Sequence, residues 1–375
     1  MLTVELVDTA VKSHVRRFVQ LPFRLYARDP LWVPPLLMDV ELPLNRAKHP
    51  YYEHSAADFF LAVRDGRDVG RLAVLEYRPY NAQHAVRRAQ FYYFDCEEDA
   101  EAAGALFQRA AEWARARGLD TLIGPKGFGP LDGYGLLVEG FEHRPAMTMM
   151  NYNFPYYPRL LEGLGFVKEV DFVSCYAPAR DFRMPERLRP IAERAARRAG
   201  LRVLQFKSKR ELTDWAPRIG AAYNQAFVNN WEYAPLTERE IKLVLDNLLV
   251  IADPRLIKIM IHADAVVGFL FGFADVSAAL QRARGRLLPF GLVDLMLEVR
   301  RTKWIAINGA GILPAFQGQG GNALLYIEME KTLRAMSFEH ADFTQVAETA
   351  VQMRRDLENL GGRPYKNHRV FLKTL

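Results

Sequence analysis

The chain has 375 residues, of which 50% are hydrophobic and 25% are charged, a composition typical of a globular protein. This length favours two domains over one. No apolar run is long enough to span a bilayer, and the N-terminal residues lack the apolar core of a secretory signal, so we expect a cytoplasmic protein with no membrane partner. The net charge of +6 favours an anionic ligand, but it is too diffuse to indicate a nucleic-acid partner.

In the first half, the predicted elements follow the order of an α/β domain. Residues 58–77 form two apolar runs around a polar turn, which predicts a hairpin, and residues 89–95 predict a further strand. An amphipathic helix follows, with apolar residues at helical spacing between Ala103 and Ala114. A short strand, another helix and a closing strand at 167–177 complete this half.

The second half repeats this order. A hairpin is predicted at 256–273, a strand at 303–313, a long helix after it, a short strand at 341–346 and a closing strand at 364–373. We interpret the repeat as an internal duplication of one α/β domain, with the boundary in the Pro- and Arg-rich stretch near residue 180. The predicted domains are therefore residues 1–180 and 181–375. The second half also carries an extra helix-like stretch at roughly 276–302, which the first half lacks.

The two cysteines, Cys96 and Cys175, have neither the spacing of metal ligands nor that of a redox pair. We interpret both as small buried side chains in a reducing compartment, and we expect no metal site.

Three glycines, Gly318, Gly320 and Gly321, lie between the strand at 303–313 and the following helix. One interpretation is a tight turn. The other is a cradle for a phosphate, because glycine lets an anion approach the backbone and a helix N-terminus presents unpaired N–H groups. The stretch is not a Walker loop, and its spacing differs from the dinucleotide-binding fingerprint.

The run from Gly311 to Leu325, "GILPAFQGQGGNALL", resembles motif A of the Gcn5-related N-acetyltransferase (GNAT) superfamily. Gln317 fills the first position of that motif and Gly320 its central glycine, whereas Asn322 stands where Gly or Ala is usual. The resemblance implies tandem GNAT-like domains, each a mixed, mostly antiparallel sheet flanked by helices. It also implies that acetyl-CoA or another acyl-CoA binds here as co-substrate. The implied contacts are main-chain groups of Ile312 and Leu313 with pantetheine, and a pyrophosphate cradle of Gln317, Gly318, Gln319, Gly320, Gly321 and Asn322.

Other stretches, among them "NYNFPYYPRLLEGLGF" and "NNWEYAPLTERE", resemble a bacterial group of GNAT-like proteins with two such domains. The first half has acidic residues, at 97–101, where the cradle would stand, and these would repel a pyrophosphate. We therefore interpret residues 1–180 as a degenerate GNAT-like domain that does not bind CoA.

Acyl transfer to an amine needs a base for the amine and an acid for the leaving thiolate. The tyrosine that often serves as acid in the GNAT superfamily is replaced by Leu357. Tyr365 is the nearest substitute, although a packing role in the closing strand is the favoured interpretation of this residue. Glu348 is a candidate base that could instead cap a helix, and Glu232 is a third candidate on the acceptor side.

A GNAT sheet opens between its fourth and fifth strands, and this resemblance predicts where the acceptor lies. Asn308 and Gly309 on one strand should line the opening together with Gln345 and Glu348 on the other, although Gly309 could instead mark only a structural bulge. Trp231 or Tyr233 should form the opposite wall.

Three hypotheses about function remain open at this point. The first is an acyl-CoA-dependent N-acyltransferase, acting by direct transfer on a small amine or amino-acid-like acceptor. The second is an aminoacyl-tRNA-dependent transferase of the tandem GNAT-like type. The third is a non-catalytic CoA-binding or scaffold protein. The sequence does not indicate an oligomeric state.

Overall fold

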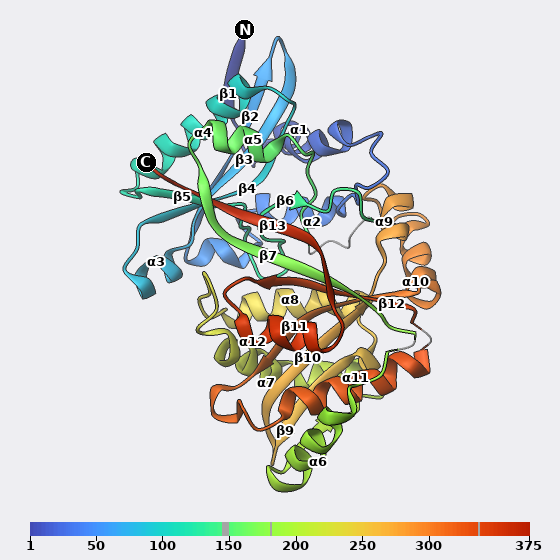
Figure 1. The fold of residues 1–375 in the computed structure, drawn as a ribbon. Coiled ribbons are helices and arrows are strands. Elements are labelled where there is room, and N and C mark those ends of the chain that lie inside the picture. Colours follow the sequence, from blue (N-terminus) through green and yellow to red (C-terminus); the bar gives the residue numbers. More distant parts are fainter. Residues whose placement is uncertain (145–149, 181, 337) are drawn as a thin grey trace. The chain divides into compact units, whose positions relative to one another are not determined.

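Both predicted hairpins lie in β-sheets of the computed structural model, which describes residues 1–144, 150–180, 182–336 and 338–375 (Figure 1). The chain divides into two units by its internal contacts. Unit 1 consists of Met1–Val173, Ser277–Asp294 and Tyr365–Leu375, and unit 2 consists of Ser174–Val276 and Leu295–Pro364. Within the described residues, no helix is both long and apolar enough to cross a membrane.

The sheet of unit 1 has the strand order β1-β2-β3-β4-β5-β13 and is mostly antiparallel. Its one parallel pair in the described residues joins β4 to β5. The β2–β3 hairpin turns at Asp65 and Gly66, which both have positive φ, as a two-residue hairpin turn requires. The strands are β1 (Leu2–Leu6), β2 (Ala56–Arg64), β3 (Arg67–Glu76), β4 (Arg88–Cys96), β5 (Thr121–Gly124), β6 (Leu136–Glu139), the first part of β7 (Val167–Pro178), and β13 (Arg363–Thr374).

Helices cover both faces of this sheet. Phe107 of α4 packs edge-on against Phe91 of β4, and Phe18 of α1 does the same against Phe59 of β2. The helical elements of unit 1 are α1 (Lys12–Leu25), α2 (Leu37–Glu41), η1 (Leu42–Leu44), η2 (Pro50–Glu53), α3 (Arg78–His84), α4 (Ala100–Arg115), α5 (Tyr157–Gly163) and α9 (Ser277–Ala283).

The sheet of unit 2 has the order β7-β12-β11-β10-β9-β8, with β11 and β12 parallel. Its strands besides the end of β7 are β8 (Leu201–Leu204), β9 (Ile257–His262), β10 (Ala265–Ala274), β11 (Trp304–Ile312) and β12 (His340–Ala347). The helical elements are η3 (Glu186–Leu188), α6 (Arg189–Arg198), α7 (Lys209–Phe227), α8 (Glu238–Ile251), η4 (Pro254–Leu256), α10 (Gly291–Arg301), η5 (Pro314–Phe316), α11 (Gly321–Met336) and α12 (Val351–Asn359). The first four residues of α10 are assigned to unit 1.

The two units repeat one plan, as the sequence predicted. Each has an antiparallel hairpin, then a strand with a bulge, a long helix and a parallel strand. The bulge interrupts the register of β4 at Tyr93, where φ is 48°, and that of β11 at Gly309, where φ is 94°. The predicted fold class, two α/β domains with mixed, mostly antiparallel sheets flanked by helices, is confirmed.

The units differ from the two continuous halves that we predicted, residues 1–180 and 181–375. The C-terminal strand β13 pairs with β5, from Phe371 opposite Gly124 to Thr374 opposite Thr121, so the last residues of the chain belong to unit 1. In turn, the end of β7 from Ser174 onward belongs to unit 2, where β7 neighbours β12. The predicted extra helical stretch forms α9 and α10, and its residues 277–294 are part of unit 1.

Candidate functional site

Strands β11 and β12 pair over only part of their length. Their register runs from Trp304 opposite His340 to Ile307 opposite Phe343, although both strands continue beyond this point. At the next residues β11 bulges around Gly309, where an added Cβ would lie 2.9 Å from Phe271 Cδ2. Beyond the bulge β11 stays paired with β10. Backbone groups of β11 and β12 past Ile307 and Phe343 therefore do not pair with one another.

The predicted acceptor residues on these strands lie just past that point. Asn308 directly follows Ile307, and Gln345 comes two residues after Phe343. Both are half-buried, and Gln345 has a positive φ of 49°. Its amide N–H donates a 3.1 Å hydrogen bond to Ser174 Oγ, so this backbone group faces β7. A role for Asn308 and Gln345 in binding stays a prediction.

The glycine-rich turn between β11 and α11 contains two backbones with positive φ, Gly318 at 75° and Gly320 at 84°. An added Cβ on Gly320 would lie 2.8 Å from Ile191 Cγ2 of α6, and one on Gly321 would lie 2.7 Å from Met260 Cε of β9. These two glycines allow close packing. At Gly318 the added Cβ would meet nothing within 4 Å, so this part of the turn borders open space.

Hydrogen bonds within unit 2 fix the shape of the turn. The side chain of Gln317 donates to the carbonyl oxygen of Ile312 at 3.1 Å, and that of Gln319 donates to Ala315 at 3.0 Å. The amide of Leu313 donates to the carbonyl of Val267 on β10. The Ile312 carbonyl and the Leu313 amide, which belong to the main-chain groups predicted to contact pantetheine, therefore already have hydrogen-bond partners within the protein.

The first turn of α11 supplies the remaining donors. The first amides of an α-helix have no acceptor within the helix, and the helix dipole places partial positive charge there. Asn322, in this first turn, uses its side chain to donate a 2.8 Å hydrogen bond to Asp356 Oδ2 of α12. The donor set and the open space at Gly318 fit a pyrophosphate, which would be held by the amides from Gly318 to Asn322. The nearby carboxylate of Asp356 opposes such binding.

The three catalytic candidates lie in different places. Glu348 directly follows β12 and is half-buried, and Glu232 is 4% exposed on the loop between α7 and α8, with a positive φ of 52°. Tyr365 belongs to unit 1, where its ring lies 5.1 Å from that of His143. Leu357 is buried in α12, so this position serves packing. The catalytic assignments stay predictions.

The loop that carries Trp231 and Tyr233 follows α7, which crosses β11. An added Cβ on Gly311 of β11 would lie 3.0 Å from Ala226 Cβ near the end of α7. The Tyr233 hydroxyl donates a 2.6 Å hydrogen bond to Asn224 Oδ1, which anchors the loop to the helix. Trp231 is half-buried. The loop that carries Trp231 and Tyr233 therefore begins where α7 packs on β10 and β11.

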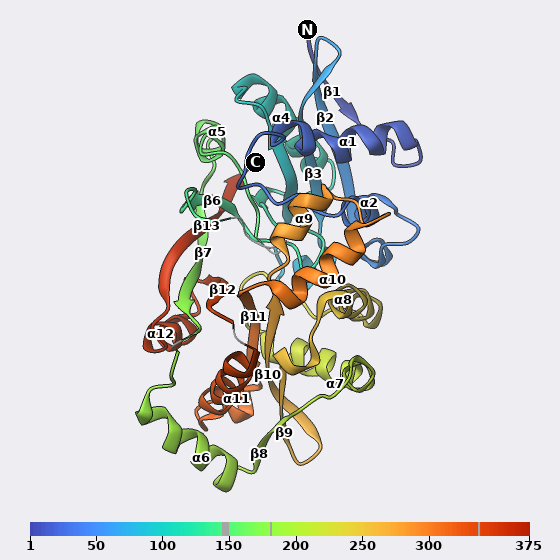
Figure 2. The same cartoon turned by 90° about the vertical axis from the view of Figure 1, so that its right-hand side faces the viewer.

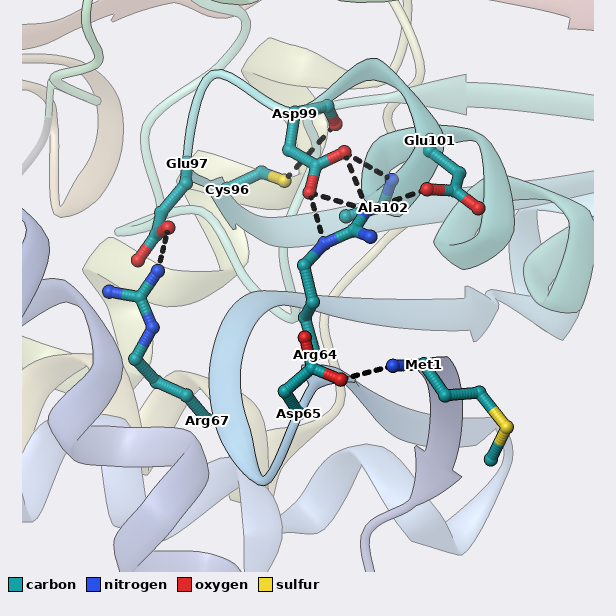
Figure 3. A network of polar contacts seen from close by, with 9 residues as sticks. All are labelled: Met1, Arg64, Asp65, Arg67, Cys96, Glu97, Asp99, Glu101 and Ala102. Atoms are coloured by element: carbon teal, nitrogen blue, oxygen red, sulfur yellow. Dashed lines mark hydrogen bonds and ion pairs between the residues drawn. The ribbon is translucent and has the colours of Figure 1, made fainter.

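In unit 1 the acidic residues at the corresponding strand-to-helix turn are held by arginines of the β2–β3 hairpin (Figure 3). Arg64 binds Asp99 and Glu101, and Arg67 binds Glu97. Asp99 also caps α4 by accepting a 3.0 Å hydrogen bond from the amide of Ala102. Side chains thus occupy the helix N-terminus where a phosphate would lie.

The end of β4 is also closed by side chains. The amide of Cys96 donates a 2.9 Å hydrogen bond to the Tyr157 hydroxyl, and the Tyr156 hydroxyl donates to the Cys96 carbonyl at 2.7 Å. Both main-chain groups of this residue therefore have protein partners. Sequence reasoning missed the roles of Tyr156, Tyr157, Ile191 and Asp356, because each acts through a contact distant in sequence. In the described part of the chain, no group of His, Cys, Asp and Glu side chains could hold a metal ion.

No protein-family model matches the chain. A bacterial ceramide synthase of Caulobacter vibrioides (strain NA1000 / CB15N) is 29% identical over 382 residues, covering 99% of this chain and 98% of that protein. Protein YghO of Escherichia coli (strain K12) is 25% identical over 370 residues, covering 97% and 94% of the two chains.

Two solved structures have similar folds over the whole chain. A tandem GNAT protein from the clavulanic acid biosynthesis pathway has a TM-score of 0.57 at 13% identity, covering 100% of this chain and 98% of its own. A GCN5-related N-acetyltransferase from Sphaerobacter thermophilus has a TM-score of 0.52 at 13% identity, covering 100% and 95%. These likenesses extend over both units.

Proposed function

We propose that this chain, which has the tandem fold of the Gcn5-related N-acetyltransferases, is an acyl-CoA-dependent N-acyltransferase whose CoA site lies in unit 2. The observation that carries the proposal is the end of β11–β12 pairing at Ile307, followed by the bulge at Gly309 and the glycine turn into α11. Where two neighbouring strands stop pairing with one another beside a helix N-terminus, an extended cofactor can lie along the strands while its pyrophosphate binds the helix amides. Unit 1 has a bulged strand too, but acidic residues bound by Arg64 and Arg67 stand in place of the glycine turn. Tyr156 and Tyr157 also bind the end of its β4.

The chemistry proposed is direct transfer. The amine nitrogen attacks the thioester carbonyl carbon, a C–N bond forms, the C–S bond breaks, and CoA leaves as the thiol once its sulfur is protonated. Glu348 or Glu232, which both belong to unit 2, accepts the amine proton. Tyr365 belongs to unit 1, so its role as the acid for the sulfur stays a prediction from the sequence. Glu232 is the more shielded of the two carboxylates, at 4% exposure.

The acceptor that we favour is the amine of a long-chain amino alcohol. This choice follows from the ceramide synthase of Caulobacter vibrioides, which resembles this chain over nearly all of both lengths. A ceramide is the amide of such an amine with a fatty acid, so its synthesis is an N-acyl transfer. The small or amino-acid-like amine expected from the sequence is the alternative acceptor.

A direct assay tests the proposal. The purified chain is incubated with short- and long-chain acyl-CoA and with sphinganine, lysine or glucosamine, and amide products are measured by mass spectrometry while free thiol is followed. We expect one amide per released CoA, with sphinganine preferred. A matched pair of variants tests the base: Glu348→Gln should lose activity, whereas Glu358→Gln, at an exposed position of α12, should keep it.

The same assay separates the remaining hypotheses. Product formed without tRNA excludes an aminoacyl-tRNA-dependent transferase. CoA binding without product from any amine would favour the non-catalytic CoA-binding protein and contradict our proposal. Amide formed only with lysine or glucosamine would keep the enzyme class and reject the lipid acceptor.

A further inference from the structure

The stretch from Arg284 to Arg301, which includes α10, has no counterpart in the first half of the chain and no part in the proposed chemistry. An exposed turn at residues 288–290 lies within it and continues without interruption as α10. Figure 2 shows α9 and α10 as the two orange helices. This stretch is called the α10 segment below.

The α10 segment exposes large apolar side chains along one face. Leu288 is 79% exposed and Phe290 is 78% exposed, and Val293 and Met296 are both more than half exposed. Leu292 and Leu297 are exposed as well, whereas Leu295, on the other side of the helix, is buried. Positions 292, 293, 296 and 297 follow helical spacing, so they share a face. A contiguous exposed apolar face of this kind marks an interaction site.

Basic residues flank the apolar face at both ends. Arg284 and Arg286 precede it, Arg300 and Arg301 follow it, and all four are exposed. Asp294 of the segment is bound by Arg282 through hydrogen bonds of 2.8 Å and 2.9 Å, which neutralises its charge. Glu298 is the other acidic residue of the segment. Residues 282–301 therefore carry five arginines against two carboxylates, a net charge of +3, and this complements an anionic partner.

We propose that the α10 segment docks onto the surface of an anionic phospholipid bilayer. Phe290, Met296 and their apolar neighbours would enter the boundary between headgroups and acyl chains, while the flanking arginines contact lipid phosphates. The expectation of no membrane partner rests on the lack of a membrane-spanning run and of a secretory signal. A helix that lies in the membrane interface needs neither, so those two observations do not exclude this docking. The proposal does not depend on the proposed function. It would give an enzyme with a long-chain acceptor direct access to the phase where that acceptor dissolves.

Vesicle flotation with the full chain tests this docking. One set of vesicles contains phosphatidylcholine alone, and the other contains about one third phosphatidylglycerol. We expect the wild type to float only with the anionic vesicles, and raised salt to weaken binding. The triple variant Leu288→Ser, Phe290→Ser, Met296→Ser should bind at least about tenfold more weakly. The control variant Met38→Ser, Val167→Ser, Val250→Ser changes three apolar residues elsewhere that are each more than half exposed, and it should bind like the wild type.

Three results would overturn the proposal. The first is a wild type that does not float with anionic vesicles. The second is equal flotation of the triple variant and the wild type. The third is a wild type that forms dimers without binding vesicles while the triple variant is monomeric, both measured by light scattering. In that case the apolar face would bind a second copy of the chain. Circular dichroism confirms that each variant is folded before flotation, and a charge-reversal variant, Arg300→Glu with Arg301→Glu, tests the basic flank if the triple variant does not fold.

Discussion

The side-chain amide of Asn322 donates a 2.8 Å hydrogen bond to Asp356 Oδ2, which ties the first turn of α11 to α12. Gln352 of α12 donates to the other carboxylate oxygen of Asp356 at 3.0 Å. The residue that departs from the usual glycine or alanine of the motif therefore has a structural partner. As a result, the Asp356 carboxylate lies beside the glycine turn, where we place the pyrophosphate of CoA.

Removing this negative charge should strengthen CoA binding. Asp356→Asn keeps a side chain that can accept a hydrogen bond from Asn322 and removes the repulsion of a phosphate. We expect the Kd for CoA, measured by calorimetry at low salt, to fall by about two- to fivefold, with the gain shrinking as salt is raised. Weaker CoA binding by Asp356→Asn, with the fold unchanged, would indicate that the carboxylate supports the site.

Acyl transfer should not pass through cysteine. Burial raises the pKa of Cys175 to about 11 and raises the pKa of Cys96 further, so both are thiols at neutral pH and poor nucleophiles. The double variant Cys96→Ala, Cys175→Ala should keep its turnover rate in the amide assay, after its folding is checked because both side chains are buried. Mass spectrometry of the wild type with acyl-CoA alone should show no acylated cysteine; a trapped thioester on either residue would contradict direct transfer.

The local features of the fold could be predicted from the sequence because they depend on residues close together. Alternating apolar runs predicted the hairpins, and the glycines between β11 and α11 predicted the turn that the structure contains. A bulge at Gly309 is one of the two interpretations that the sequence allows for this glycine, and the structure contains it. Each of these depends on backbone preferences that one or two residues express.

Contacts between distant residues could not be predicted in this way. Both closing strands, β7 and β13, carry similar apolar patterns, and nothing in these patterns says that β13 pairs with β5 of the first half. The glycine at 320 was interpreted as part of a phosphate cradle, whereas its missing Cβ also makes room for Ile191 of α6. Only the folded chain brings these partners together.

The stability of unit 1 should depend on the protonation of His368. Burial lowers the pKa of this side chain from 6.5 to about 4, and its Nε2 lies 3.0 Å from the Asn151 carbonyl oxygen. The unfolded state therefore takes up the proton first, and the contribution of His368 to stability is complete above pH 6.5 and is lost as pH falls toward 4. The difference between the His368 pKa of 6.5 in the unfolded state and about 4 in the folded state corresponds to about 3 kcal/mol of unfolding free energy.

A variant isolates this effect from groups that oppose it. Burial raises the pKa of Asp132 to about 6, which favours the folded state as the pH falls below that value. His368→Gln does not titrate and can still donate to Asn151. We expect the free energy of unfolding of the wild type to fall relative to that of His368→Gln between pH 6.5 and 4, measured by denaturant titration. Parallel pH profiles for the two proteins would show that His368 is not responsible.

Trp231 should act on the acceptor and not on CoA. Trp231→Ala removes a half-buried ring from the loop after α7, and we expect the acceptor KM to rise by about tenfold with little change in the KM for acyl-CoA. Trp215→Ala, which removes a half-buried tryptophan from α7 of the same unit, is the control and should change neither value selectively. Tyr233 is less suitable for this test because its hydroxyl anchors the loop to Asn224. An equal effect of Trp231→Ala on both substrates would place the acceptor elsewhere.

The central claim is that CoA binds at the glycine turn of unit 2, and Gly318 offers the most direct test. Gly320→Glu, the substitution that the motif suggests, would also displace Ile191, so loss of binding there could reflect lost packing. At Gly318 an added side chain meets open space, and both Asp and Asn tolerate a positive φ better than other residues do. Calorimetry of CoA binding should give one site in the wild type, no measurable binding in Gly318→Asp, and binding within about threefold of the wild type in Gly318→Asn. CoA affinity unchanged in Gly318→Asp, or a second site of similar affinity in the wild type, would contradict the assignment.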